Sequence, residues 1–435
     1  MPPLSLLDNC KRPYYDGDVD FDTLATKDQD FAAICQQSKT KKWIDFQNPK
    51  VVQQLTKSLL KADFGLAVHL PDDRLCPPVP VRWNYVRWLQ ELLDTTSDEY
   101  SETYDSERKV LGLDIGVGAS CIYPLLACSA RPSWRMLGTD IDPHSFEHAH
   151  RNVEGNKLQG RIRLVLSKNE GPLMPLDAIG VEEMDFVMTN PPFYDSHDEM
   201  QASYTGKDAP PSAVCTGAEN EMICPGGDIG FATRILEESL KLRGRVQWYT
   251  AMLGKMSSLQ QIIVKLKDLG IGNFAVTCLQ AGYRTKRWAV AWSFQDYRPR
   301  IDVARHGGLV QAVLPPAPAQ TILLPLMGAT WAGNKIDDLL NKLDVKWQWK
   351  KQSSMGVMEA SQNVWSRSAR RKKQFKQSSG AEPDGEEEGE ECTVALAVKI
   401  TCKHEAAELR WLRGQDYILF QSFSGLLKRE LTGKP

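Results

Sequence analysis

Between residues 110 and 189, four short apolar segments alternate with segments of helical periodicity. Short apolar runs bounded by turn residues are typical of strands buried on both faces of a parallel sheet. The predicted strands are residues 110–115, 134–140, 161–166 and 186–189. Such alternation favours an α/β fold in which the carboxyl ends of the strands form one ligand-binding edge.

The first two of these strands end in residues suited to binding a nucleoside. The first ends on Asp114 and runs into Gly116 and Gly118, where glycine lets the backbone approach a ligand closely. The second ends on Asp140, 24 positions after Gly116, the offset at which a nucleoside-binding fold places a carboxylate on the ribose hydroxyls. The loop lacks the third glycine of a dinucleotide-binding loop, which disfavours a dehydrogenase.

The fourth strand stops abruptly at Asn190-Pro191-Pro192-Phe193. Because proline has no N–H and a restricted φ, the carbonyls of Asn190 and Pro191 are held ready to accept hydrogen bonds. Together with the Asn190 side-chain oxygen they could bind a planar amino group, and the Phe193 ring could stack on a flat base. The exocyclic amine of adenine fits this pattern. The alternative is a turn that only ends a strand.

Composition is that of a soluble protein with a sizeable core. Hydrophobic residues make up 42% of the 435 residues and charged residues 25%, with no apolar run near the ~20 residues of a membrane span. The N-terminus lacks the charged start of a secretory signal, so the ten cysteines are expected to be free thiols. None forms a C-x-x-C pair, so no metal site is predicted. The net charge of −2 hides local basic blocks.

Three basic groups are candidates for binding RNA phosphates. They are Lys41 and Lys42 beside an aromatic residue, Arg284, Lys286 and Arg287 between two apolar runs, and Arg370, Arg371, Lys372 and Lys373 in a larger basic block. Basic residues interleaved with aromatic residues are suited to gripping a backbone and stacking a base. Solvated helix starts or hairpin tips explain the first two groups equally well. The third is also typical of a nuclear-import signal.

Composition shifts along the chain predict several regions. They are an irregular arm at 1–42, a main domain at 43–298, a linker at 299–319 and a small α+β extension at 320–435, with a disordered basic and acidic insert at about 366–391. The long polar stretch 195–228 directly follows the fourth strand, so it is expected to cover the site.

Motif order gives a closer resemblance. The motifs are Asp63-Phe64-Gly65-Leu66, Arg82-Trp83-Asn84-Tyr85, the run from Asp114 to Leu125, Asn190-Pro191-Pro192-Phe193, Trp248-Tyr249, Met252-Leu253-Gly254-Lys255 and the run from Arg287 to Trp292. Over about residues 43–295 the chain resembles the eukaryotic U6 spliceosomal RNA adenine-N6 methyltransferases, relatives of the bacterial RlmF-type ribosomal RNA methyltransferases. The end of the chain resembles, more weakly, the RNA-binding extension of that family.

The resemblance implies a Rossmann-like class I methyltransferase domain that uses S-adenosylmethionine to methylate a structured RNA, U6 spliceosomal RNA, without a membrane. The expected location is the nucleus, with the cytoplasm as a second location. The resemblance implies cofactor contacts at Arg82, Gly116, Asp140 and Asn190. It also implies that Asn190 to Phe193 hold the adenine. The glycine loop after the first strand adds Asp114 and Gly118 as expected cofactor contacts. The family's further cofactor contact falls within residues 167–172, where this sequence departs from the pattern.

Three other functions fit the same motifs. One is methylation of an RNA other than U6. Methyltransferases that modify a glutamine amide of release factors also carry Asn-Pro-Pro followed by an aromatic residue. An RNA-binding protein that uses the cofactor as a sensor and turns over rarely would also retain the motifs. The basic segments and the C-terminal extension favour an RNA substrate.

Overall fold

The computed structural model describes residues 13–37, 44–205, 216–282, 286–325, 328–366 and 393–433. The chain forms two compact units. Unit 1 comprises Met1–Leu93, Tyr104–Gln295 and His306–Leu314, and unit 2 comprises Asp94–Thr103, Asp296–Arg305 and Pro315–Pro435. The stretch 299–319, expected to be a linker, is therefore divided between the two units. It contains the helix α13 (Ile301–Ala304) and the 3-10 turn η2 (Gln311–Val313).

Unit 1 is built on a seven-stranded sheet in the order β3-β2-β1-β4-β5-β7-β6. Its strands are β1 (Val110–Ile115), β2 (Trp134–Asp140), β3 (Ile162–Leu166), β4 (Met184–Thr189), β5 (Val246–Leu253), β6 (Phe274–Gln280) and β7 (Lys286–Trp292). The strands from β3 to β5 are parallel, whereas β7 runs antiparallel to β5 and to β6. The predicted α/β class with a mostly parallel sheet is confirmed.

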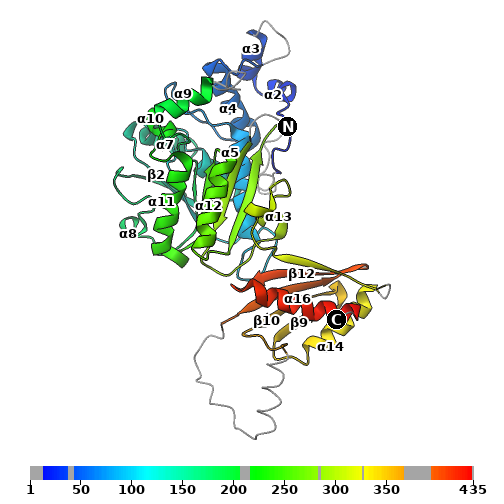
Figure 1. Ribbon diagram of the computed structural model, residues 1–435. Helices are drawn as coiled ribbons and strands as arrows, with labels where there is room; N and C mark the ends of the chain where they lie inside the picture. The colour runs from blue at the N-terminus through cyan, green and yellow to red at the C-terminus, as the bar shows by residue number, and fades with distance from the viewer. Residues whose placement is uncertain are drawn as a thin grey trace. The chain divides into compact units, whose positions relative to one another are not determined.

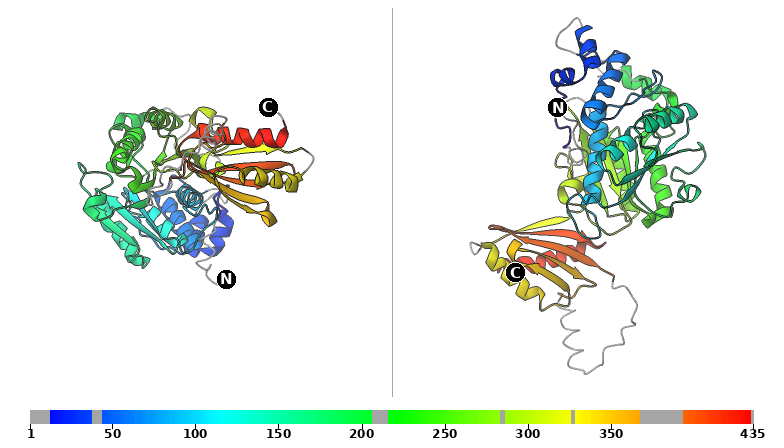
Figure 2. Two further views of the ribbon diagram at one scale, coloured as in Figure 1. Left: turned by 90° about the horizontal axis from the view of Figure 1, so that it is seen from below. Right: turned by 180° about the vertical axis from the view of Figure 1, so that it is seen from behind.

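Helices cover both faces of this sheet. They are α4 (Pro49–Phe64), α5 (Val79–Asp94), α6 (Ile122–Ala130), α7 (Pro143–Gly155), α8 (Leu176–Ile179), α11 (Gly227–Leu242) and α12 (Met256–Asp268), whereas α9 (His197–Thr205) and α10 (Glu219–Met222) lie beyond the ends of the strands (Figure 1). The helices α8, α11 and α12 share one apolar core with the strands, and Figure 1 shows α11 and α12 side by side on that face. Viewed from behind, α4 and α5 lie on the opposite face (Figure 2).

The order of the strands explains where a ligand binds. The chain first winds outward from β1 to β3 and then returns to place β4 on the other side of β1. In open parallel sheets the crevice at such a reversal lies beyond the carboxyl ends of the strands. Here those ends belong to β1 and β4, which carry the glycine loop and the Asn-Pro-Pro-Phe stretch.

The N-terminal arm is more regular than the sequence suggested. The helices α2 (Phe21–Lys27) and α3 (Gln29–Gln37) lie within the segment expected to be irregular, and they pack against α4. Asp20 caps α2 by accepting a hydrogen bond from the Thr23 N–H, and the buried Phe31 ring anchors α3. The polar composition hid these helices, because their few apolar residues gain stability only by packing on α4.

Unit 2 is a five-stranded antiparallel sheet in the order β8-β12-β11-β10-β9. Its elements are β8 (Ala319–Leu323), α14 (Gly328–Leu340), β9 (Lys346–Lys350), the turn η3 (Lys351–Ser353), β10 (Met355–Ala360), β11 (Leu396–Cys402), β12 (Ala406–Arg413) and α16 (Tyr417–Thr432). The two helices share one apolar core with the sheet, where the Trp411 and Phe420 rings stack 5.4 Å apart. This is the predicted α+β architecture, with the helices on one face.

Two segments that precede β8 in the chain belong to unit 2. Arg298 N–H donates to the Leu412 carbonyl over 2.8 Å, and its guanidinium lies 4.0 Å from the Trp411 ring centroid. Glu102 pairs with Lys399 and Arg410 on the sheet. No helix within the described ranges is long and apolar enough to cross a membrane.

Candidate active site

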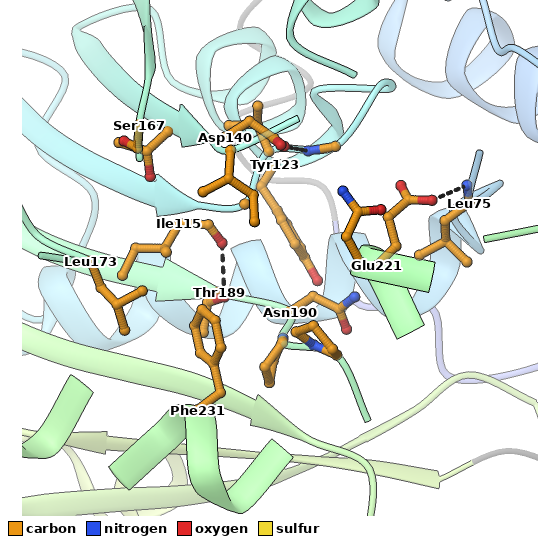
Figure 3. Close-up of a pocket in the computed structure, with 18 of the residues that line it drawn as sticks. Leu75, Ile115, Tyr123, Asp140, Ser167, Leu173, Thr189, Asn190, Glu221 and Phe231 are labelled. Carbon is orange, nitrogen blue, oxygen red and sulfur yellow. Dashed lines mark hydrogen bonds between the residues drawn. The ribbon is translucent and has the colours of Figure 1, made fainter. Parts of the chain in front are cut away.

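The carboxyl ends of β1, β2 and β4 open onto one hollow in unit 1, here called the strand-end cavity. Its wall includes Leu75, Arg82, Gly116, Gly118, Tyr123, Asp140, Ser167, Asn190, Glu221 and Phe231. Figure 3 shows these strand ends converging on one space, with Tyr123 and Asn190 directed into it. The residues expected at separate strand ends therefore meet at one site.

The glycine loop after β1 is held against the end of β2. The N–H groups of Gly116 and Val117 both donate to the Thr139 carbonyl, over 2.8 and 3.0 Å. Gly116 and Gly118 have φ of 76° and 61°, in the left-handed region that favours glycine. This conformation turns the loop sharply enough for the cavity to reach the strand ends.

Asp140 links the two strand ends through its carboxylate. Oδ2 accepts from the Gly118 N–H over 2.8 Å, and Oδ1 accepts from the Asp142 N–H over 2.9 Å. The side chain is 8% exposed, and burial raises the pKa of its carboxyl. Each oxygen retains a lone pair for a further donor, so Asp140 is equipped to bind ligand hydroxyl groups.

Asp114 lies beneath the loop and is fully buried. Among the described residues, neither of its carboxylate oxygens has a hydrogen-bond partner. Burial, reinforced by the nearby Asp140 charge, raises the pKa of Asp114 well above its usual range. A buried carboxylate without hydrogen bonds is costly, so this environment favours the protonated, uncharged carboxyl of Asp114.

The side chain of Asn190 is oriented by Arg82. Arg82, 5% exposed on α5, donates from Nη1 to Asn190 Oδ1 over 3.0 Å and also contacts Met252 Sδ at 3.1 Å. Its guanidinium carbon lies 5.7 Å from the Tyr123 ring centroid. The amide oxygen of Asn190 is thereby held in place with one lone pair still available.

The segment after Asn190-Pro191-Pro192-Phe193 is held by hydrogen bonds to a downstream turn. Tyr194 N–H donates to the Met222 carbonyl and its own carbonyl accepts from the Cys224 N–H, both over 3.0 Å. Asp195 Oδ1 accepts from the Gly226 N–H over 2.6 Å. Part of the polar stretch 195–228 therefore packs directly on the site, while residues 206–215 lie outside the described ranges.

The Phe193 ring lies between a glycine and an arginine. A Cβ at Gly254 would lie 3.1 Å from the ring, so only glycine leaves the ring its present position. Arg287 lies on β7, and its guanidinium carbon is 5.0 Å from the centroid of the Phe193 ring. Burial lowers the pKa of Arg287. An aromatic face backed by a cation can accept a stacked base.

A family described as RNA methyltransferase matches residues 8–296, more than half of the chain. The chain belongs to this RNA methyltransferase family. A Schizosaccharomyces pombe relative, "U6 small nuclear RNA (adenine-(43)-N(6))-methyltransferase", is 39% identical over 392 residues, covering 89% of this chain and 95% of that protein. The Homo sapiens "RNA N(6)-adenosine-methyltransferase METTL16" is 38% identical over 296 residues, 66% of this chain. The chain spans about half (50%) of that human relative.

Solved structures from the family agree with the fold. The human METTL16 catalytic domain in complex with MAT2A 3′UTR hairpin 1 is 36% identical, with a TM-score of 0.56, covering 63% of this chain and 91% of that one. The N-terminal domain of human METTL16 in complex with SAH is 35% identical, with a TM-score of 0.53, covering 66% and 98%. The resemblance found in the sequence and the Rossmann-like class I fold are confirmed.

In the structure, the site residues predicted from the sequence fall into three groups. Arg82, Gly116, Gly118, Asp140 and Asn190 line the strand-end cavity, with Pro191 and Pro192. Asp114, also predicted to contact the cofactor, is fully buried beneath the loop and is not among the residues that line the cavity. Phe193 and Arg287 lie against each other, and Lys286 is exposed at the start of β7. Lys41, Lys42, Arg284, Arg370, Arg371, Lys372 and Lys373 lie outside the described residues, so their binding of RNA stays a prediction.

Several cavity residues were not predicted from the sequence. Ser167, Lys168, Asn169, Gly171 and Pro172 supply the wall after β3, within the range where no residue could be chosen. Leu75, Glu221 and Phe231 come from segments outside the motifs of the strand ends. A carboxylate in a long polar stretch carries no distinguishing local pattern, so only tertiary contacts reveal Glu221.

Proposed function

We propose that this chain transfers a methyl group from S-adenosylmethionine to N6 of an adenosine in U6 small nuclear RNA. The observation that carries the proposal is that Asn190, Pro191 and Pro192, which precede Phe193, line the same cavity as the glycine loop and Asp140. The S. pombe relative, which this chain matches over 95% of its length, carries the same activity in its name. The human structures in complex with RNA hairpins support a structured RNA as the substrate.

The residues of the strand-end cavity fit the cofactor. Asp140 offers acceptors for ribose hydroxyls, and Arg82 offers a guanidinium for a carboxylate. When bound, S-adenosylmethionine supplies an electrophilic methyl group.

Asn190 and Pro191 would act on the nucleophile. The adenine N6 lone pair is delocalised into the ring, so N6 is a poor nucleophile until its geometry changes. Hydrogen bonds from N6 to Asn190 Oδ1 and the Pro191 carbonyl favour a pyramidal nitrogen and stabilise the positive charge that develops on it. Arg82 contributes by fixing the direction of Oδ1, which costs no reorganisation during the reaction.

Phe193 would hold the base beside these acceptors. Its ring is positioned by Gly254 on one side and Arg287 on another, so a flipped base meets a rigid stacking partner. A paired adenine cannot reach this position inside a helix. The expected substrate therefore presents its adenosine in a bulge or an unpaired segment.

Nuclear localisation is part of the proposal. The block containing Arg370, Arg371, Lys372 and Lys373 supports it by composition, because such runs serve as import signals or RNA contacts. Imaging of a fluorescent fusion with and without these four charges tests it. Cytoplasmic accumulation of only the neutralised protein is the expected result, and an unchanged distribution contradicts the import role.

The activity itself is tested with methyl-labelled cofactor and a U6 transcript. The label should appear in N6-methyladenosine after digestion to nucleosides, and it should disappear when the target adenosine is replaced by guanosine. Total RNA and a release-factor protein serve as competing substrates. Label in another RNA or in a glutamine amide would overturn the substrate assignment.

Turnover separates an enzyme from a cofactor-dependent sensor. An enzyme continues to methylate when RNA exceeds protein and forms many methyl groups per protein chain, even where product release makes the multiple-turnover rate the slower one. A sensor would stop after about one methyl group per protein chain.

A further inference from the structure

Glu221 belongs to a segment far from the strand-end motifs, yet its carboxylate lines the strand-end cavity. Oε2 accepts from the Leu75 N–H over 2.9 Å and from the Ala218 N–H over 2.8 Å. Figure 3 shows the bond to Leu75, with Glu221 among the residues of the cavity wall. The side chain is therefore anchored through one oxygen.

The other oxygen, Oε1, faces the glycine loop. It lies 3.6 Å from where a Cβ on Gly118 would stand. The N–H of the same glycine donates to Asp140 Oδ2 over 2.8 Å. Two carboxylates from distant parts of the chain thus converge on Gly118.

These two carboxylates are poorly solvated in the protein alone. Burial raises the pKa of Glu221 and that of Asp140, and the Asp140 charge adds to the rise for Glu221. A ligand that donates hydrogen bonds to both would offset this cost. A ribose does so, because its 2′ and 3′ hydroxyls are adjacent donors on one ring face.

We propose that Glu221 is a second cofactor-binding carboxylate, which accepts a ribose hydroxyl of S-adenosylmethionine through Oε1 beside Asp140. This inference rests on the proposed function, since it names a further residue of the same site. It differs from a purely structural role, because Oε2 alone already satisfies the backbone donors of Leu75 and Ala218.

The location of Glu221 gives it a second effect on the site. The next residue, Met222, accepts the Tyr194 N–H, and Tyr194 follows Phe193 directly. Cofactor bound to Glu221 would therefore hold α10 and the segment beyond Phe193 together. Glu221 acts on Phe193 as a positioning residue and on the cofactor as a ligand.

The test compares Glu221→Gln with Glu219→Gln by calorimetry on the full chain. Glutamine keeps an oxygen for the backbone N–H groups but turns an amide donor toward the ligand. Glu219 is the matched control, since it lies on the same helix and its side chain, which contacts His197, is 72% exposed. Melting temperatures without cofactor should be alike for both variants and the unaltered chain.

Two ligands locate the contact: S-adenosylhomocysteine and 5′-methylthioadenosine, which keeps the ribose but lacks the amino-acid portion. Glu221→Gln should weaken the binding of both ligands by about the same factor, tenfold or more, as expected for loss of a hydrogen bond to a charged group. Glu219→Gln should change neither. Equal affinities in all three proteins would overturn the inference, and so would a loss confined to S-adenosylhomocysteine. Failure of the unaltered chain to bind either ligand would instead contradict the proposed function.

Hydrogen exchange supplies an independent readout. In the unaltered chain, S-adenosylhomocysteine should slow amide exchange in residues 218–224, and Glu221→Gln at saturating ligand should lose most of that protection. Protection that persists in the variant would contradict the link between Glu221 and the segment beyond Phe193.

Discussion

Arg82 Nη1 donates to Asn190 Oδ1 over 3.0 Å, although the two residues lie 108 positions apart. The bond joins α5 to the end of β4 and decides which way the Asn190 amide points. It also joins a residue expected to bind the cofactor to one expected to bind the adenine. Substitution of Arg82 should therefore lower the rate of methyl transfer.

Asn190→Ala removes the amide oxygen that faces N6. The single-turnover rate at saturating RNA and cofactor should fall by ~100-fold or more, as loss of a transition-state hydrogen bond commonly does. RNA affinity should stay nearly constant, because stacking and phosphate contacts remain. Arg82→Ala should add little to the rate loss in the Asn190→Ala background, since the two residues act through one bond. Full additivity would contradict this coupling.

Gly254→Ala introduces a methyl group 3.1 Å from the Phe193 ring. The ring must shift by a few tenths of an ångström, which should lower the methyl-transfer rate while cofactor affinity is retained. Gly244→Ala is the matched control, since no atom lies within 4 Å of its added Cβ. A rate equal to that of the control would show that the ring position is unimportant.

Arg287→Gln removes the cation beside Phe193. RNA binding, measured by fluorescence anisotropy, should weaken by up to the ~1 to 3 kcal/mol of one stacked base, because the Phe193 ring loses a neighbour that holds it in place. Arg243→Gln serves as the control, because Arg243 lies 5.4 Å from the Phe294 ring centroid before the amino end of β5, away from the cavity. Equal losses in both variants would indicate a nonspecific charge effect.

Asp114→Asn should change how stability depends on pH. Burial raises the pKa of folded Asp114 well above its unfolded value, so the folded chain holds the proton more tightly. The free energy of unfolding should then fall as pH rises through the interval between the two pKa values. Asparagine cannot ionise, so the variant's stability relative to the unaltered chain should increase with pH in denaturant titrations without cofactor.

The control for this experiment is Asp177→Asn, whose side chain is 86% exposed. Its stability difference from the unaltered chain should show no comparable rise with pH. A pH-independent difference for Asp114→Asn would mean that the carboxyl is not held protonated by burial.

Replacing Arg370, Arg371, Lys372 and Lys373 with serine tests the basic block. If the block touches RNA, the dissociation constant should rise and its dependence on salt should become shallower, because fewer counterions are released. Cofactor affinity and the single-turnover rate at saturating RNA should not change. An unchanged salt slope would leave the block with no part in RNA binding.

The sequence by itself was sufficient where structure depends on local pattern. The bounds of β1 and β2 agree with the predicted 110–115 and 134–140, because a buried parallel strand is a continuous apolar run with a sharp end. The glycine loop and the Asn-Pro-Pro-Phe stretch were likewise recognisable from backbone chemistry alone. In contrast, β10 and β12 were not predicted, because the buried face of β10 carries the small residues Gly356 and Ala360, and the charged residues Glu408 and Arg410 interrupt the apolar pattern of β12.

Tertiary structure alone decided which of these residues meet. Arg287 and Phe193 had been assigned to different contacts, yet the antiparallel pairing of β7 with β5 brings them together. Arg82 was expected to contact the cofactor, and the packing of α5 also lets it donate a hydrogen bond to Asn190. Glu221 reaches the cavity only because the polar stretch after β4 folds back on the glycine loop. Such contacts follow from strand order and chain reversal, which periodicity and spacing along one segment do not encode.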